Sequence, residues 1–157
     1  MEPAMEEIER KFLLDGPPPI IDGRAPTRIV QAYLAITADT EVRIRARAGD
    51  RVLTVKGGRG LSRREVSIPL TGEQFDELWE LTDGRHLTKR RWVIAERDVE
   101  LEIDVFEGDL DGLVIAEVEF PSEEASAAFV PPPWFGREVT DDGAYRNAAL
   151  ATEGLIR

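Results

Sequence analysis

Short segments in which apolar and polar residues alternate run through most of the chain, separated by Gly, Pro and Asp. Residues two apart in a β-strand share one face, so this alternation predicts strands with one polar and one apolar side. Many short strands separated by turn residues are typical of an antiparallel sheet with meander connections. Eight strands are expected, over residues 6–14, 28–36, 41–48, 51–56, 63–69, 87–95, 99–107 and 113–120.

Three further segments carry helix signals. Residues 71–81 begin with Thr71 as the N-cap and Gln74 three residues later, which is a capping box, and apolar residues follow at helical spacing. Residues 122–129 open with a serine and two glutamates and end before three consecutive prolines, which forbid continuation of the helix. A last helix is expected from residue 141 or 142 to residue 151.

Eight antiparallel strands are enough to close a barrel whose interior holds side chains or one small ligand. A length of 157 residues suits one domain with a sizeable core. The expected fold class is therefore α+β, mainly β: an eight-stranded antiparallel closed barrel with flanking helices, forming a single domain over residues 1–157.

Composition limits the partners. The chain has 31 acidic and 20 basic residues and a formal net charge of -11, which opposes binding to a nucleic-acid backbone. The absence of cysteine excludes disulfides and thiolate metal sites. The acidic start lacks the regions of a signal peptide, and no apolar run approaches the roughly 18 to 20 residues of a membrane span. These features predict a cytoplasmic, soluble protein with neither nucleic acid nor membrane as a partner.

The polar faces of several predicted strands carry like charges. Arg43, Arg45 and Arg47 share one face, and Glu117 and Glu119 share another. Polar faces in a half-buried sheet ordinarily point to solvent, but like charges placed side by side repel each other. We therefore expect the charged faces to line the inside of the barrel. Because burying unpaired ions costs several kcal/mol, such an interior needs a ligand of complementary charge.

The two kinds of charge indicate the ligand. Carboxylates from strands at opposite ends of the chain suit a hard cation such as Mg²⁺ or Mn²⁺, which prefers oxygen ligands. The basic side chains suit a polyanion, because Arg makes forked contacts to phosphate oxygens and Lys supplies a point charge. The sequence predicts a metal-bound polyphosphate in the barrel.

Residues 7–11, EIERK, resemble the ExExK signature of the CYTH superfamily, the triphosphate tunnel metalloenzymes. Other segments are similar to the family in the same order: QAYL at 31–34, RIRAR at 43–47, LTVKGGRGLSRRE at 53–65, TKRRW at 88–92, and longer stretches at 100–120 and 131–151. The resemblance implies an eight-stranded barrel with an open, charged lumen. It is strongest to the small bacterial inorganic triphosphatases.

The resemblance also implies roles for individual residues. Five acids match the metal site: Glu7, Glu9, Asp104, Glu117 and Glu119. Seven cations match the triphosphate-binding positions: Lys11, Arg43, Arg45, Lys56, Arg63, Lys89 and Arg91. The residues expected to act in catalysis are Lys11, Glu65, Lys89 and Arg91. Ser67 departs from the family pattern, because relatives often carry a second glutamate there.

The activity that the resemblance implies is hydrolysis of inorganic triphosphate to pyrophosphate and phosphate with Mg²⁺ or Mn²⁺. A class IV-type adenylyl cyclase or a thiamine triphosphatase is an alternative. Either would need a pocket for a base or thiazolium, for which Tyr33 and Trp92 are candidate stacking groups, although packing is the ordinary role of both. A polyphosphate-binding module without catalysis is a third hypothesis, motivated by Ser67. The single histidine, His86, is expected to be structural.

Overall fold

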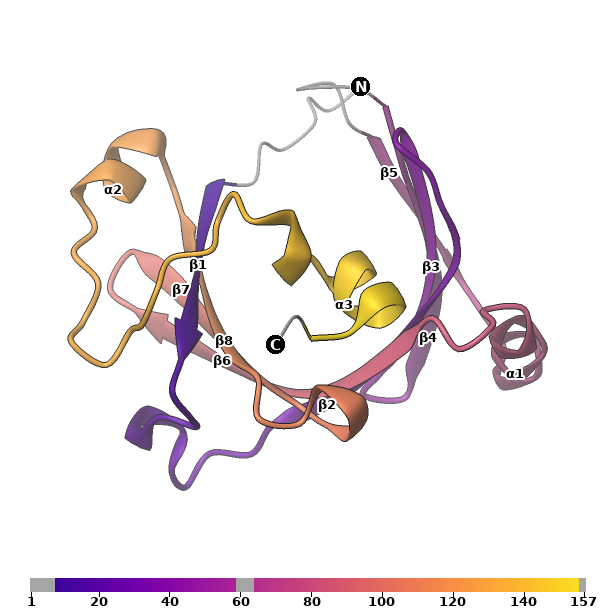
Figure 1. The fold of residues 1–157 in the computed structure, drawn as a ribbon, viewed down its shortest axis with the longest axis horizontal. Coiled ribbons are helices and arrows are strands. Elements are labelled where there is room, and N and C mark those ends of the chain that lie inside the picture. The colour runs from indigo at the N-terminus through magenta and orange to yellow at the C-terminus, as the bar shows by residue number, and fades with distance from the viewer. Residues whose placement is uncertain (1–7, 59–63, 156–157) are drawn as a thin grey trace.

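One antiparallel sheet of eight strands dominates the computed structural model, which describes residues 8–58 and 64–155. The strand order is β1-β8-β7-β6-β2-β3-β4-β5, and the sheet curves around a central space (Figure 1). The strands are β1 Ile8–Leu14, β2 Thr27–Ile36, β3 Thr40–Arg47, β4 Asp50–Gly57, β5 Arg64–Pro69, β6 His86–Glu96, β7 Val99–Phe106 and β8 Val114–Phe120. The expected eight antiparallel strands are confirmed.

The helices are short and lie on both sides of the sheet (Figure 1). They are α1 Gly72–Glu80, α2 Glu123–Ala128 and α3 Asn147–Glu153, with 3₁₀ turns η1 Pro19–Ile21, η2 Gly108–Leu110 and η3 Gly143–Tyr145. The capping box of α1 is confirmed, because the Thr71 hydroxyl accepts from the Gln74 amide and the Gln74 side chain accepts from the Thr71 amide. No helix in residues 8–58 and 64–155 has the length and apolar character needed to cross a membrane.

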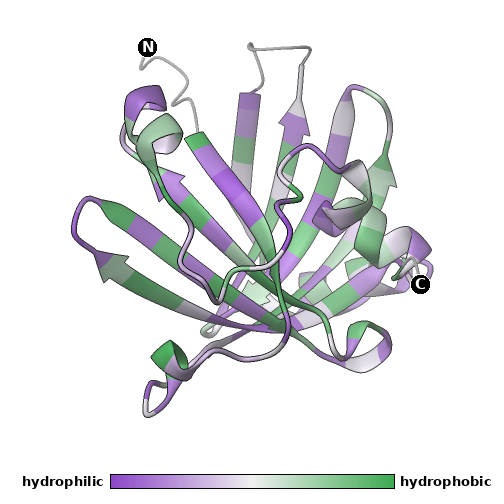
Figure 2. Cartoon of the chain, turned by 60° about the vertical axis from the view of Figure 1, so that its left-hand side comes forward, coloured by the Kyte–Doolittle hydropathy of each residue, from purple (hydrophilic) through white to green (hydrophobic). Residues whose placement is uncertain are grey.

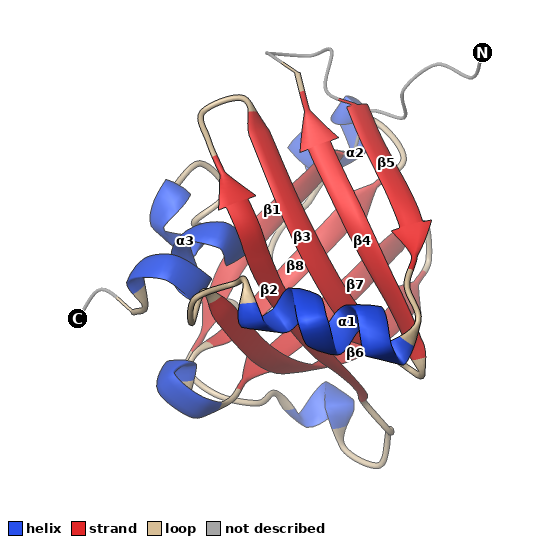
Figure 3. Cartoon of the chain, turned by 90° about the vertical axis from the view of Figure 1, so that its right-hand side faces the viewer, coloured by secondary structure: helices blue, strands red, loops and turns tan. Residues whose placement is uncertain are grey.

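The apolar faces of the strands point outward. Helix α1 lies across the outside of β3 and β4 (Figure 3), where Phe75 packs on Ile44. On the other half of the sheet, Phe12 and Phe120 pack under α2 and the chain that follows it. Apolar and polar residues alternate along these strands (Figure 2). Because alternate residues face opposite sides, the charged residues between them face the central space, as the sequence predicted.

No hydrogen bonds pair β1 with β5, the two strands at the ends of the strand order, within the described part of the chain. The free edge of β1 is taken by residues 136–139 instead. The Gly136 amide donates to the Leu13 carbonyl at 2.7 Å, and the Leu13 amide donates to the Arg137 carbonyl at 2.9 Å. The C-terminal segment therefore uses the backbone groups of β1 that a closing strand would need.

The last helix also differs from the expectation. The predicted single helix is divided into η3 and α3, because Arg146 between them has an extended backbone with φ -71° and ψ 144°. The division lets the chain turn into the central space, where α3 lies inside the curve of the sheet (Figure 1). Leu150 and Ala151 of α3 pack in one apolar cluster with Tyr33 and Leu87. Helix α3 is thus a plug on the inner, concave side of the sheet, which we call the tunnel, and not a flanking helix.

Gly136 is tightly enclosed where the C-terminal segment meets β1. A Cβ added there would lie 2.6 Å from the Leu13 carbonyl oxygen. We expect Gly136→Ala to lower the free energy of unfolding by about 1 to 3 kcal/mol, because the backbone at residue 136 must move away from the Leu13 carbonyl to make room for the added methyl group. Urea unfolding of both proteins measures the change. Gly143→Ala is the matched control, because a Cβ there meets nothing within 4 Å; equal stability of the two variants would contradict the prediction.

Candidate active site

Acidic side chains gather on the inner faces of β1, β8 and β7. Glu9 pairs with Glu119 across β1 and β8, and Glu119 pairs with Glu100 across β8 and β7, so three glutamates form one row. In the next row, Glu117 of β8 lies between Lys11 of β1 and Glu102 of β7. This is the like-charge arrangement that indicated an inward, ligand-binding face.

Three of these carboxylates are close enough to share a cation. Glu100, Glu102 and Glu119 each offer an oxygen, and these oxygens lie within 4.8 Å of one another. Burial raises the pKa of Glu102; Arg91 opposes this rise, and the nearby Glu117 adds to it. Three carboxylate oxygens are a donor set that suits a hard divalent cation, and a cation would relieve their mutual repulsion. The described residues therefore contain an acidic cluster able to bind such an ion.

The structure places the predicted metal ligands in different surroundings. Glu119 belongs to the cluster, while Glu9 and Glu117 are the strand neighbours of its members. Glu7 lies outside the described residues. Sequence reasoning missed Glu100 and Glu102 as candidate ligands, although both share the inner face of β7 with Asp104 and that alternation was the available signal.

Asp104 lies outside this cluster, in a buried network with two cations. Its carboxylate accepts from Lys89 Nζ at 2.9 Å and from Arg91 Nε and Nη2 at 2.8 and 2.9 Å. Burial alone would raise the pKa of Asp104, but the charges and hydrogen bonds of Lys89 and Arg91 outweigh it and lower that pKa to about 2. Arg91 also contacts Glu102 at 3.3 Å, so it links this network to the acidic cluster.

Lys89 has no exposed surface. Burial lowers the pKa of its ammonium to about 8, although Asp104 opposes the change, and at pH 7 the charged form still predominates. The ammonium also donates to Asn147 Oδ1 of α3 at 3.2 Å. The plug therefore covers a cation that the sequence assigned to the substrate.

Arg43 and Arg45 differ from Lys89 and Arg91 because they contact no carboxylate among the described residues. Arg45 Nε and Nη2 donate to the Gln31 carboxamide oxygen at 3.1 and 2.9 Å. Burial, and after it the charges of Arg43 and Arg91, together lower the pKa of Arg45 to about 10. Arg43 is 8% exposed, and its Nε is a buried polar atom without a hydrogen-bond partner in the described chain. Two poorly compensated guanidiniums on β3 are a place for an anion.

The remaining predicted residues lie on or next to β1 and β5, the two strands at the ends of the strand order. Lys11 Nζ donates to the Tyr145 carbonyl at 3.2 Å, so the C-terminal segment contacts a second predicted lysine. Lys56 on β4 is 4.0 Å from Glu65 on the edge strand β5. Ser67, also on β5, shares a hydrogen bond with Thr54 at 3.0 Å. Arg63 lies outside the described residues.

The aromatic candidates have packing roles. Trp92 lies in the outer apolar core, and its indole donates to the Arg24 carbonyl at 3.0 Å. Tyr33 points inward but is covered by the cluster that includes α3. His86 is exposed on the outside and stacks on Trp79 at 4.8 Å. Neither Trp92 nor Tyr33 presents an open ring for a base.

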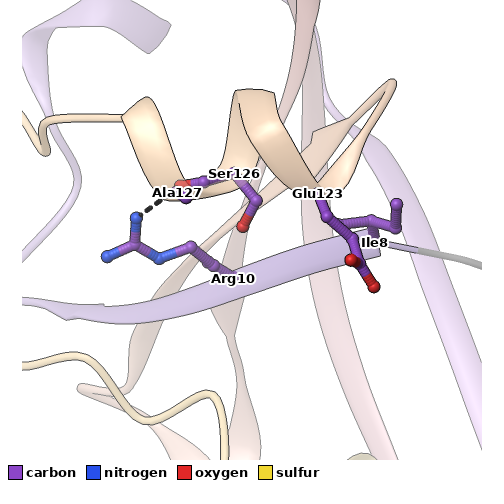
Figure 4. A pocket seen from close by; sticks show the side chains of 5 residues that line it. All are labelled: Ile8, Arg10, Glu123, Ser126 and Ala127. Atoms are coloured by element: carbon purple, nitrogen blue, oxygen red, sulfur yellow. Dashed lines mark hydrogen bonds between the residues drawn. The ribbon is translucent and has the colours of Figure 1, made fainter.

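A separate surface pocket lies outside the tunnel, between β1 and α2 (Figure 4). Arg10 lines it and points away from the inner face, donating to the Ser126 and Phe129 carbonyls. Its guanidinium also forms an ion pair with Glu138 at 2.7 Å. These contacts attach α2 and the C-terminal segment to β1, and the pocket holds none of the residues predicted to bind substrate or metal.

Comparison with known proteins identifies the family. The CYTH domain model matches residues 5–141. The chain is 46% identical over 152 residues to the inorganic triphosphatase of Nitrosomonas europaea, covering 94% of this chain and 97% of that protein. It is 36% identical over 148 residues to the inorganic triphosphatase of Acetivibrio thermocellus, covering 92% of each. Its fold is similar to the solved inorganic triphosphatase NE1496, with a TM-score of 0.76, 41% identity and 97% of each chain covered. With a family match over most of its length, the chain belongs to the CYTH domain family.

Proposed function

We propose that this chain hydrolyses inorganic triphosphate to pyrophosphate and phosphate with the help of a divalent cation. The observation that carries the proposal is the inward-facing charge: Arg43 and Arg45 on β3, which contact no carboxylate among the described residues, face the same central space as the carboxylate cluster on β7 and β8. A polyanion with a bound cation would contact the arginines through its phosphate oxygens and the carboxylates through the cation. The two inorganic triphosphatases at 46% and 36% identity support the same reaction.

The basic side chains would hold the phosphate chain. Arg43 and Arg45 have guanidinium donors that no carboxylate of the described residues takes, and forked contacts to phosphate oxygens suit them. Arg91 and Lys89 are oriented by Asp104. A phosphate oxygen would reach Lys89 by replacing the Asn147 carboxamide that now accepts from it. Lys11, Lys56 and Arg63 complete the proposed cation set, and Glu65 keeps its proposed catalytic role beside Lys56.

The carboxylates would hold the cation, which we propose to be Mg²⁺ or Mn²⁺. Glu100, Glu102 and Glu119 supply the oxygens, with Glu9 and Glu117 beside them and Glu7 as a further proposed ligand. When bound, the cation supplies charge neutralisation on the phosphate oxygens. The fixed cations spread the charge that develops on the transferred phosphoryl group while water attacks phosphorus in line, so positioning and electrostatics do most of the catalysis.

The substrate is proposed to be the inorganic chain and not a nucleotide or thiamine triphosphate. Trp92 packs in the outer core and Tyr33 is covered by α3, so neither stacking candidate serves a base or thiazolium. We further propose that residues 1–157 act as a single domain in the cytoplasm, as the sequence predicts. The triphosphate is the only partner that the proposal requires.

A substrate panel tests the activity. With Mg²⁺ or Mn²⁺, we expect kcat/KM for tripolyphosphate to exceed that for ATP and thiamine triphosphate by at least about tenfold, because neither Trp92 nor Tyr33 offers an open ring to their organic groups. Phosphate and pyrophosphate should form in a one-to-one ratio. Preferential conversion of ATP to a cyclic nucleotide would favour the cyclase alternative. Tight tripolyphosphate binding without phosphate release under either metal would favour the binding module.

A further inference from the structure

Gln31 is a fully buried polar residue in the wall of the tunnel. It lies on the inner face of β2, directly opposite Arg45 in the register with β3. Its carboxamide oxygen accepts two hydrogen bonds from the Arg45 guanidinium, at 3.1 and 2.9 Å, and its nitrogen donates to the Tyr33 hydroxyl at 2.9 Å. Both ends of the carboxamide are therefore used, and they fix the plane of the guanidinium.

The hydrogen-bond partner of Arg45 is neutral, whereas Lys56, Lys89 and Arg91 each lie beside a carboxylate. Lys89 and Arg91 contact the Asp104 carboxylate, and Lys56 lies near Glu65. Arg45 has no carboxylate within ion-pair distance among the described residues, and a neutral amide takes its place. A carboxylate there would bind the guanidinium more strongly but would neutralise it. A neutral acceptor gives orientation without loss of positive charge.

We propose that Gln31 is a positioning residue, whose neutral carboxamide orients the Arg45 guanidinium while leaving its charge for a phosphate oxygen of the substrate. This inference rests on the proposed function, because it takes triphosphate as the anion in the tunnel. It assigns to a buried residue of β2 a share in setting substrate affinity, although Gln31 itself need not touch the substrate. Arg43, whose charge acts on Arg45 and whose Nε finds no hydrogen-bond partner among the described residues, adjoins the same site.

The alternative role for Gln31 is packing and internal hydrogen bonding alone. The two roles make opposite predictions about which of two substitutions is the more harmful. Gln31→Glu keeps the size and the acceptor, and the Tyr33 hydroxyl can rotate to donate to the new carboxylate, so a purely structural role predicts a mild effect. Gln31→Leu removes both polar contacts, so a structural role predicts a larger effect. If Gln31 preserves the charge of Arg45, Gln31→Glu is the more harmful change for binding.

The experiment measures the Kd of sodium tripolyphosphate by calorimetry without divalent metal, and KM and kcat with Mg²⁺. We expect Gln31→Glu to raise Kd and KM by at least about tenfold, the loss of one charge-assisted contact, with kcat changed by less than about threefold. Gln31→Leu should raise Kd by only about threefold, because the charge remains. In an Arg45→Gln background, Gln31→Glu should change Kd by less than about twofold, because it acts through Arg45.

Gln74→Glu is the matched control. It makes the same change of net charge, but Gln74 is exposed on α1, and glutamate also fits a capping box there; its Kd should equal that of wild type. Circular dichroism and thermal unfolding check that each variant is folded. Equal Kd values for Gln31→Glu and wild type, or a larger loss in Gln31→Leu than in Gln31→Glu, overturn the inference alone. A wild-type chain that neither binds nor hydrolyses tripolyphosphate overturns the proposed function and this inference with it.

Discussion

Replacing Lys89 by Met is expected to lower kcat/KM for tripolyphosphate by about 10²- to 10³-fold, as for other preorganised groups that stabilise developing charge. The ammonium is fully buried and is held at 2.9 Å from Asp104, so its position is fixed before substrate arrives. Methionine keeps most of the side-chain volume but removes the charge. Steady-state kinetics with saturating Mg²⁺ measures the effect, and a change of less than about threefold would remove Lys89 from the proposed site.

Loss of stability must be separated from loss of catalysis in this variant. Lys89→Met leaves the buried Asp104 carboxylate with Arg91 alone, and the lost charge-assisted hydrogen bond should cost about 1 to 3 kcal/mol of unfolding free energy. Adding Asp104→Asn should recover part of that stability in urea unfolding but none of the activity. Arg90→Met is the matched control: Arg90 follows on the same strand, but it faces outward in an exposed ion pair with Glu107, which contributes little.

Glu119→Gln is expected to weaken Mn²⁺ binding and to lower kcat/KM at limiting Mn²⁺ by at least about tenfold, with partial recovery at higher metal concentration. Its carboxylate is one of the three oxygen donors that lie within 4.8 Å of one another, and an amide oxygen is a weaker ligand without charge. Electron paramagnetic resonance of free Mn²⁺ measures binding without reference to activity. Removal of divalent metal by a chelator should stop turnover of the wild-type protein.

Two further variants sharpen this test. Asp104→Asn should weaken Mn²⁺ binding less than Glu119→Gln does, because the structure places Asp104 in contact with Lys89 and Arg91 and outside the acidic cluster. Glu77→Gln removes one carboxylate from the exposed side of α1 and controls for net charge. If Asp104→Asn weakened Mn²⁺ binding as much as Glu119→Gln, the cluster on β7 and β8 would be the wrong metal site.

The sequence alone determined the strands and the direction in which their faces point. A period of two is a local property, and it marked the eight strands that the structure contains. The inward direction of the charged faces followed from repulsion between like charges, as on β3 with Arg43 and Arg45, because repeated like charges on a face indicate a ligand of opposite sign. The capping box of α1 could also be predicted from the sequence, because its two partners are only three residues apart.

Only the tertiary structure decided which inward residues meet. The sequence placed Asp104 among the acids of the inner faces. The pairing of β6 with β7 brings Asp104 into contact with Lys89 and Arg91. The acidic cluster is formed by Glu100, Glu102 and Glu119. The contacts of Gln31 with Arg45 and of Asn147 with Lys89 join separate strands or a strand and a helix. Alternation states which residues share a face, but strand register and the path of the C-terminal segment set the distances between side chains. Those depend on packing of the whole chain, which no local pattern contains.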